Sequence, residues 1–372
     1  MAQKNIIPAL TGIRAISAYF IFLFHLNFFS SATHEHLYVF LNQFYCFTNF
    51  FFVLSGFLIY YRYGDISTLN QTVLHNYFVD RVARIYPILF LLVSATFFTA
   101  YYHHYYSTGE TIKLYLLNIS LLKGFSAKYW FSGIGPSWSL SVEELFYLLA
   151  PLIFLYAKNI STLIKTVLIF YGIGLAFTLL FHYFPFENFF DNLLFTSYFT
   201  FFGRAFEFAC GIFLGMVVKG KIKNNFAGSP GKYSLYAGLL IISASIIFLY
   251  LIATYYNIEH ATNSWIGMGV NNILLPLGIT ILFYSLIYHK SLLERFLSSA
   301  VMVQLGNATY SFYLLHTSFV LSYIFKFISK NIFIAFICMV IVSYIFHKLI
   351  EQPLALIVRK RFHKNYYPVS QA

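Results

Sequence analysis

Charged residues are scarce in this chain. Only 10% of the 372 residues are Asp, Glu, Lys or Arg, whereas 59% are hydrophobic, and soluble domains carry about 25% charged residues. Uninterrupted apolar runs recur along the sequence, and a helix that crosses a bilayer needs about 20 such residues. The scarcity of charge therefore excludes a soluble globular protein and predicts an integral membrane protein embedded in a lipid bilayer.

Cysteine is also rare. Cys46, Cys210 and Cys338 lie far apart inside apolar runs, so the sequence has neither the pattern of a disulfide framework nor the spacing of a zinc site. The adjacent His103 and His104 would point to different sides of a helix and make a poor metal pair. We expect no metal site.

Acidic residues are half as numerous as basic ones, 12 against 24. The basic residues lie at the ends of apolar runs and no soluble basic domain is present, so we attribute them to membrane topology and expect no nucleic-acid partner. If the N-terminus is cytoplasmic, eighteen basic residues fall on the cytoplasmic side and five on the other. This asymmetry predicts an even number of spans with both ends in the cytoplasm.

The apolar runs predict an all-α, polytopic transmembrane helix bundle that forms one domain, residues 1–372, without an appended extracellular domain. The segment Thr111–Lys123 is too short to cross a bilayer and precedes a glycine-bearing loop, so we expect a short interfacial or re-entrant helix there. We expect about ten spans, which begin near Ile13, Gln43, Ile85, Trp138, Leu163, Leu193, Ser234, Gly267, Tyr310 and Asn331.

The first apolar run carries Arg14 and His25. The two residues return to nearly the same helical face, with a rise of roughly 16 Å between them, which resembles the length of an extended pantetheine arm. Arg14 could therefore bind a phosphate at the membrane surface while His25 acts as a general base inside. In the alternative interpretation, Arg14 is a topological anchor and His25 is a hydrogen-bonded packing residue.

A second basic motif precedes the third span. Arg81 and Arg84 are three residues apart and neighbours on one helical face, and guanidinium groups bind phosphate bidentately. The pair is a candidate binding site for a ligand that carries phosphate, although basic residues at that place also serve as topological anchors.

Two adjacent carboxyl groups, Glu143 and Glu144, interrupt the fourth span. Ser139 shares a helical face with Glu143, so this helix can present a hydroxyl and a carboxylate to a polar cavity. Near the interface these acids could instead simply be solvated.

Two further groups are open to more than one interpretation. Arg204 and Glu207 form an i,i+3 pair, which is more typical of a structural ion pair inside the membrane. His316 could line the same cavity and bind substrate, or it could be a core histidine.

Together these segments resemble the membrane-bound acyltransferase family 3 over Leu10–Pro353. The resemblance rests on motifs in this order: Arg-x10-His (Arg14 to His25), FFVLSGFLI (Phe51–Ile59), Arg-x-x-Arg (Arg81 to Arg84), PSWSLSVEELFY (Pro136–Tyr147), GRAFEFACG (Gly203–Gly211), LGNATYSFYLLH (Leu305–His316) and EQP (Glu351–Pro353).

The resemblance implies an enzyme of the bacterial inner membrane that transfers an acyl group, commonly acetyl, to a hydroxyl of a cell-envelope carbohydrate such as lipopolysaccharide O-antigen, exopolysaccharide or a lipid-linked glycan. In the family both arginine motifs are functional, and these roles map onto Arg14, His25, Arg81 and Arg84. We expect acetyl-CoA to enter from the cytoplasm and to react by direct transfer or through an acyl-His25 relay. In this mechanism Glu143 would orient the catalytic His25, and Trp138 and Ser139 would bind the sugar acceptor. A transporter or flippase of a lipid-linked sugar and a structural membrane subunit are the alternatives.

Overall fold

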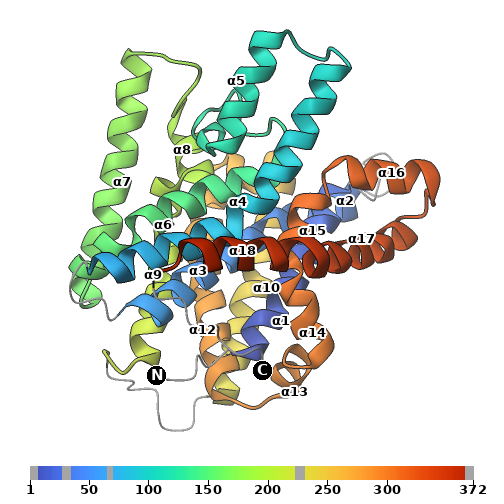
Figure 1. Ribbon diagram of the computed structural model, residues 1–372. Coiled ribbons are helices and arrows are strands. Elements are labelled where there is room, and N and C mark those ends of the chain that lie inside the picture. Colours follow the sequence, from blue (N-terminus) through green and yellow to red (C-terminus); the bar gives the residue numbers. More distant parts are fainter. Residues whose placement is uncertain (1–6, 27–34, 65–69, 223–230, 365–372) are drawn as a thin grey trace.

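The computed structural model describes residues 7–26, 35–64, 70–222 and 231–364. These residues are almost entirely helical (Figure 1), which confirms the predicted all-α class, and their one isolated β-bridge joins Ser126 and Phe189. Within the described part of the chain, nine helical segments are long and apolar enough to cross a membrane. They are Pro8–His25, Glu35–Tyr63, Gln71–Tyr102, Gly135–Tyr156, Ile160–Tyr183, Leu193–Val218, Tyr233–Tyr256, Trp265–Tyr288 and Ile332–Phe362.

Several of these spans are built from more than one helical element. The first half of the chain contains α1 (Pro8–His25), α2 (Glu35–Asn42), η1 (Gln43–Phe47), α3 (Thr48–Tyr63), α4 (Gln71–Tyr102), α5 (Thr108–Ile119), η2 (Leu122–Phe125), η3 (Gly135–Ser137), α6 (Trp138–Tyr156) and α7 (Ile160–Tyr183). The second half contains α8 (Leu193–Phe199), α9 (Phe201–Val218), α10 (Gly231–Tyr256), η4 (Ala261–Asn263), α11 (Trp265–Gly269), η5 (Val270–Leu274), α12 (Leu275–Tyr288), α13 (Leu292–Leu297), α14 (Ala300–Asn307), α15 (Thr309–Leu315), α16 (Phe319–Phe327), α17 (Ile332–Phe346), η6 (His347–Glu351) and α18 (Gln352–Phe362).

The span expected to begin near Tyr310 is broken. In its place lie the short helices α14, α15 and α16. Helix α15 ends at Leu315, with His316 as its C-cap. Ser318 then adopts an extended conformation and caps α16 by accepting a hydrogen bond from the Val320 amide. Three consecutive polar residues, His316, Thr317 and Ser318, interrupt the apolar run at the break between α15 and α16, and this signal was not used in the prediction of a span.

The α3–α9 crossing forms a backbone contact in the bundle core. A Cβ atom on Gly56 would lie 2.2 Å from the carbonyl oxygen of Phe208, and one on Gly211 would lie 2.0 Å from that of Val53. Small residues at such positions let membrane helices approach closely, and van der Waals packing then stabilises the pair. The crossing fixes α3, which forms one wall of the site.

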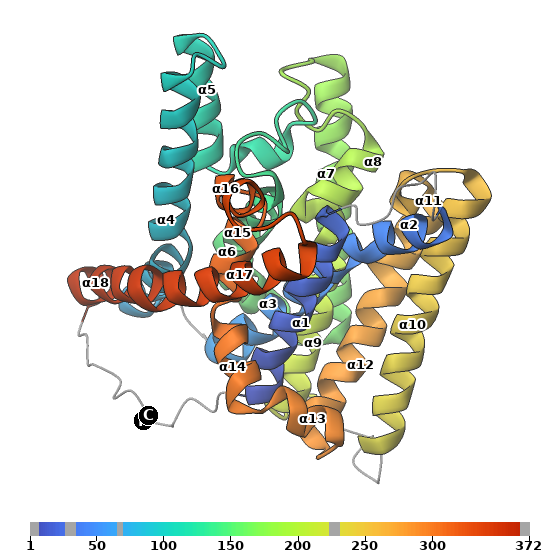
Figure 2. The same cartoon turned by 90° about the vertical axis from the view of Figure 1, so that its right-hand side faces the viewer.

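Helices α17 and α18 run across the bundle rather than along it, and α18 lies beside the first part of α4 (Figures 1 and 2). Asp80 of α4 pairs with Arg359 of α18, with a distance of 3.0 Å between Oδ1 and Nε, and accepts a hydrogen bond of 2.7 Å from the Tyr63 hydroxyl. These contacts hold the turn of α4 that carries Arg81 and Arg84.

Candidate active site

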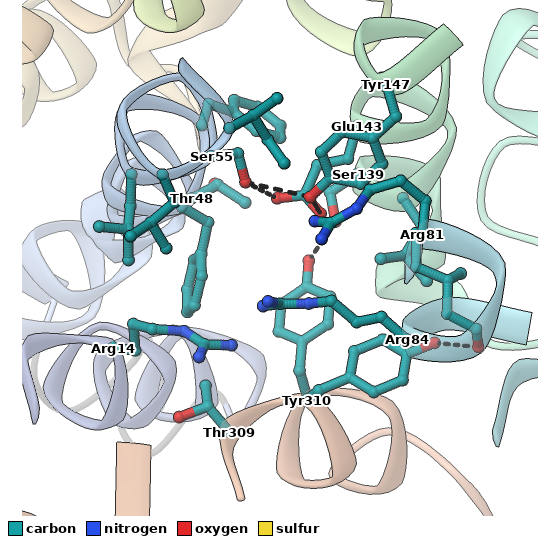
Figure 3. Close-up of a pocket in the computed structure, with 18 residues that line it drawn as sticks. Arg14, Thr48, Ser55, Arg81, Arg84, Ser139, Glu143, Tyr147, Thr309 and Tyr310 are labelled. Carbon is teal, nitrogen blue, oxygen red and sulfur yellow. Dashed lines mark hydrogen bonds between the residues drawn. The ribbon is translucent and has the colours of Figure 1, made fainter. Parts of the chain in front are cut away.

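Three arginines line one narrow cavity between α1, α3, α4, α6 and α15. Its volume is about 60 Å³, and we call it the arginine pocket. Figure 3 shows that Arg14 and Arg84 approach the same space from opposite walls. The lining residues are Arg14, Thr48, Phe51, Phe52, Leu54, Ser55, Leu58, Ile59, Arg81, Arg84, Ile85, Ser139, Leu140, Glu143, Tyr147, Thr309, Tyr310 and Tyr313.

The arginine pocket has more positive than negative charge. Arg14 and Arg84 make no hydrogen bond or ion pair with the residues that the structure describes. Arg81 is 5% exposed and its guanidinium carbon lies 5.4 Å from the centre of the Tyr147 ring. Asp80, the neighbour of Arg81 in the chain, forms its ion pair with Arg359 and does not line the pocket. Three guanidinium groups against the single carboxylate of the lining give this pocket the excess of positive charge that an anion-binding site needs.

Glu143 lies within the arginine pocket. Its carboxylate accepts hydrogen bonds from Ser55 at 2.8 Å and from Tyr147 at 3.1 Å, as Figure 3 shows. The expected direct contact with His25 is not among its hydrogen bonds. The neighbouring Glu144 does not line the arginine pocket and accepts a hydrogen bond of 3.4 Å from Tyr86.

A second and larger cavity, of about 460 Å³, begins where the arginine pocket ends. Aromatic side chains dominate its lining, so we call it the aromatic pocket. Its volume lies in the range of cavities that hold small molecules. It is lined by Ile21, Phe24, His25, Tyr45, Thr48, Trp130, Phe131, Trp138, Asn192, Leu194, Phe195, Tyr198, Phe199, His260, Thr262, Asn263 and Tyr313.

The last residue of α1, His25, faces the aromatic pocket. Its Nδ1 atom lies 2.9 Å from the carbonyl oxygen of Ile21 and 3.1 Å from Nε2 of His316. A carbonyl oxygen can only accept, so Nδ1 of His25 carries the proton. Its Nε2 atom then holds a lone pair and has no hydrogen-bond partner among the described residues. This is the protonation state that a general base requires.

His316, the C-cap of α15, is the hydrogen-bond partner of His25. It is 1% exposed, and its Nδ1 atom lies 3.2 Å from the carbonyl oxygen of Phe312. The same reasoning places its proton on Nδ1 and leaves Nε2 to accept from His25. His316 therefore lies behind His25 and is absent from the linings of both pockets.

A buried polar contact fixes α15. Glu351 of the π-helix η6 accepts a hydrogen bond of 2.6 Å from Ser311 and lies 2.9 Å from Nδ1 of His347. Ser311 is fully buried. The EQP motif thus ties the last span to the helix that carries Tyr313 and is capped by His316.

The two pockets share two lining residues, Thr48 and Tyr313. Ser139 lies at the same level, with its hydroxyl 2.8 Å from that of Tyr313, and Trp138 lines the aromatic pocket only. The sequence candidates therefore divide: Arg14, Arg81, Arg84, Ser139 and Glu143 line the arginine pocket, and His25 and Trp138 line the aromatic pocket.

Loops cover the aromatic pocket on the side away from the arginines. Glu187 accepts hydrogen bonds from Lys113, from Tyr129 at 2.7 Å and from Lys128 at 3.0 Å. The bonds from Lys113, Tyr129 and Lys128 hold the pKa of Glu187 at about 2. This network joins α5 and the loop after it to the loop before α8, and we call these connected loops the cap.

Lys123 is the buried cation of the cap. Its Nζ atom donates hydrogen bonds of 2.5 Å and 2.8 Å to the carbonyl oxygens of Ser132 and Ile134. Burial lowers the pKa of this amine to about 7, and the two carbonyl groups act against that shift by binding the ammonium form. The contact shapes the turn that leads into α6.

A fully buried network crosses from α3 to α9 and the π-helix η5. Arg204 lies 3.0 Å from Glu207, as the predicted ion pair, and donates hydrogen bonds to Asn272 at 2.5 Å and to Asn49. Asn49 in turn donates to the carbonyl oxygen of Asn271 at 2.9 Å. These contacts explain how an arginine is tolerated in the membrane core.

Two features of the site went unnoticed in the sequence. His260 lines the aromatic pocket beside Tyr45, at 5.3 Å between ring centres, and burial lowers its pKa. No motif surrounds it. The paired Asn271 and Asn272 in an apolar run were a usable signal for a buried polar network, because such residues are costly in a membrane unless they are bonded.

The adjacent His103 and His104, which the sequence suggested were a poor metal pair, lie away from both pockets. His103 and His104 lie at the end of α4 in an exposed stretch. Among the described residues, no three His, Cys, Asp or Glu side chains gather where they could bind a metal ion.

The sequence comparisons identify the family. The family model described as an acyltransferase domain matches residues 7–348, nearly the whole chain. The chain belongs to acyltransferase family 3. This membership supports an enzyme that transfers acyl groups, and with the apolar helices it makes the chain a multi-pass membrane acyltransferase.

Two curated relatives share parts of this acyltransferase. The peptidoglycan O-acetyltransferase OatA of Listeria monocytogenes is 29% identical over 188 residues, 46% of this chain. A protein of Acidianus two-tailed virus named as a candidate acetyltransferase, ORF330, is 34% identical over 105 residues, 28% of this chain. The chain spans 28% of the length of each relative. No solved structure matches it.

Proposed function

We propose that this acyltransferase transfers an acyl group, most simply acetyl, from acyl-CoA in the arginine pocket to a carbohydrate hydroxyl in the aromatic pocket. The observation that carries the proposal is the meeting of an anion-binding pocket and a roomy aromatic pocket at Thr48 and Tyr313. Arg14 and His25 lie on one helix, roughly 16 Å apart along its axis, so α1 borders both pockets.

The donor is proposed to be held by its phosphates. Arg14 and Arg84, which have no hydrogen-bonded partner among the described residues, and the buried Arg81 would bind them with charge-assisted hydrogen bonds. A cavity of about 60 Å³ does not hold a whole pantetheine arm. Donor binding must therefore widen the arginine pocket, and Arg14 and Arg84 can turn without breaking a hydrogen bond to a described residue.

The acceptor is proposed to be a cell-envelope carbohydrate. Aromatic rings offer flat apolar surfaces to a sugar ring, while Trp138, Asn192 and His260 add polar groups that can orient its hydroxyls. Similarity to a peptidoglycan O-acetyltransferase points to the same class of acceptor. We propose the bacterial cytoplasmic membrane as the location, with the arginine pocket open to the cytoplasm and the cap outside.

In the proposed reaction, His25 Nε2 takes the proton of the sugar hydroxyl while the oxygen bonds to the thioester carbon. The carbon–sulfur bond then breaks, and the CoA thiolate receives the proton from the imidazolium. His316 holds the tautomer of His25 through Nδ1. Because Glu143 is bonded to Ser55 and Tyr147, we assign it to the donor side, where it offsets part of the positive charge.

The proposal is tested with the purified protein in lipid nanodiscs. Radiolabelled acetyl-CoA should yield free CoA and labelled glycan, whereas a transporter or flippase yields neither, and that result would overturn the proposal. Acetyl phosphate in a parallel reaction distinguishes acyl-CoA from other donors. Mass spectrometry of envelope glycans with and without the protein identifies the acceptor.

The same preparation separates direct transfer from a relay. An acyl-His25 relay exchanges labelled CoA into acetyl-CoA when no acceptor is present, because the first half-reaction is reversible. Direct transfer gives no such exchange.

A further inference from the structure

The junction of the two pockets is where the acyl carbon has to lie. If the donor occupies the arginine pocket and the acceptor the aromatic pocket, as proposed above, the thioester carbonyl reaches the acceptor between Thr48 and Tyr313, which line both. A tetrahedral intermediate at this place develops negative charge on the carbonyl oxygen, and that charge needs a hydrogen-bond donor.

Two hydroxyl groups reach the junction, and they differ in what they can donate. The Thr48 hydroxyl donates to the carbonyl oxygen of Tyr45, within its own turn of helix. That bond uses the only proton of Thr48. Thr48 is therefore a wall of the junction and not a donor to a ligand.

The Tyr313 hydroxyl belongs to a cluster with the Ser139 hydroxyl and the Pro136 carbonyl oxygen. It lies 2.8 Å from the Ser139 hydroxyl and 3.1 Å from the carbonyl oxygen of Pro136, and Ser139 lies 3.1 Å from the same carbonyl oxygen. Ser139 can donate to the Tyr313 oxygen or to Pro136. In this structure the Tyr313 hydroxyl donates to the Pro136 carbonyl oxygen. When Ser139 donates to that same oxygen, the Pro136 carbonyl keeps a donor and the Tyr313 proton can turn to a ligand.

We propose that the Tyr313 hydroxyl donates a hydrogen bond to the thioester carbonyl oxygen and stabilises the oxyanion, and that Ser139 acts as a positioning residue for Tyr313. The proton stays on Tyr313 throughout. The sugar oxygen bonds to the carbonyl carbon as His25 takes the hydroxyl proton, and collapse of the oxyanion expels the CoA thiolate. Acyl-CoA and alcohol thus become ester and CoA.

The burial of the cluster strengthens this effect. Tyr313 is 7% exposed and Ser139 is 5% exposed, so water competes little for the oxyanion. Loss of one preorganised donor in such a site lowers kcat by about 10²-fold or more. His25 and Tyr313 both line the aromatic pocket, where the acceptor hydroxyl is proposed to lie.

The first experiment compares Tyr313→Phe with Tyr323→Phe, which removes a hydroxyl from an exposed tyrosine of α16. We expect kcat to fall about 10²-fold in Tyr313→Phe, with the Kd of CoA unchanged, and full activity in Tyr323→Phe. Ser139→Ala should lower kcat less. A Tyr313→Phe protein that binds CoA and keeps kcat within about twofold of wild type overturns the assignment.

The second experiment separates an oxyanion donor from a packing residue. Infrared spectra of [1-¹³C]acetyl-CoA bound to the His25→Ala protein, which cannot turn over, report the bond order of the thioester carbonyl. We expect a shift to lower wavenumber that is lost on adding Tyr313→Phe and enlarged by 3-fluorotyrosine at position 313. A carbonyl band that is identical in all three proteins contradicts the proposal.

The outcomes also distinguish the two proposals. If wild-type protein neither consumes acetyl-CoA nor forms an ester, the proposed function fails. If it does both and neither the kinetics nor the carbonyl band depends on Tyr313, only the assignment of the oxyanion donor fails.

Discussion

The arginine pocket and the aromatic pocket differ in size, in charge and in how their side chains are held. The first is narrow and cationic, with two arginines that make no hydrogen bond to a described residue. The second is about 460 Å³ in volume and lined largely by aromatic rings under a bonded cap. The contrast suggests that the anionic donor organises its pocket on binding, whereas the acceptor enters a cavity that is already formed.

The strongest test of this division is the removal of the base at the end of α1. His25→Ala should lower acyl transfer by about 10²-fold or more while CoA still binds, because the residue lines only the aromatic pocket. Transfer rate and calorimetric Kd are measured on the same preparation. Substitution of the exposed His182 by alanine is the control. Near wild-type transfer by well-folded His25→Ala protein would show that His25 is not the base.

The arginine pocket should show the opposite pattern. Arg81→Ala and Arg84→Ala should each weaken CoA binding by about 10- to 100-fold, the effect of losing a charged hydrogen bond, and lysine should rescue only part of it. Arg62→Ala, which removes an exposed arginine outside both pockets, is the matched control. Unchanged CoA affinity in both alanine variants would show that Arg81 and Arg84 do not bind the donor and would favour their interpretation as topological anchors.

A smaller effect is expected from the aromatic wall. Trp138→Ala should raise the KM for the glycan about three- to tenfold by loss of stacking, with the Kd of CoA unchanged. Trp138→Phe should retain most of the affinity, and the exposed Trp265→Ala is the control. A change in CoA affinity instead would break the division between the pockets.

The smallest effect concerns the cap. The pKa of Lys123 is about 7 in the folded protein against 10.5 in the unfolded chain, so between these values the unfolded state binds more protons and stability rises with pH. Below pH 7 both states are protonated and the contribution is constant. Melting temperatures should therefore rise from pH 7 to pH 10 more in wild type than in Lys123→Met, with Lys326→Met as the control. Parallel curves would show that the two carbonyl groups cancel the shift.

The sequence alone predicted those features that depend on residues close together in the chain. The lengths of the apolar runs predicted the helical membrane bundle, and helical periodicity placed Arg14 and His25 on one face of α1. The gathering of Arg81, Arg84 and Glu143 around Arg14 involves α1, α4 and α6, and the motifs pointed to it only through their family resemblance.

Other parts of the site depend on long-range contacts that no local pattern encodes. The partner of His25 is His316 rather than Glu143 because the broken segment brings α15 against α1, and the spacing of residues along the chain does not predict this contact. The same holds for Thr48 and His260, which become site residues only through neighbours far along the chain.

The most direct test of the central claim, that the two pockets hold donor and acceptor, is an experimental structure of the protein in nanodiscs with bound CoA. The account predicts the phosphates of CoA at Arg14, Arg81 and Arg84, a widened arginine pocket, and the thiol between Thr48 and Tyr313 facing His25. Bound CoA in the aromatic pocket, or with its thiol away from that junction, would contradict it.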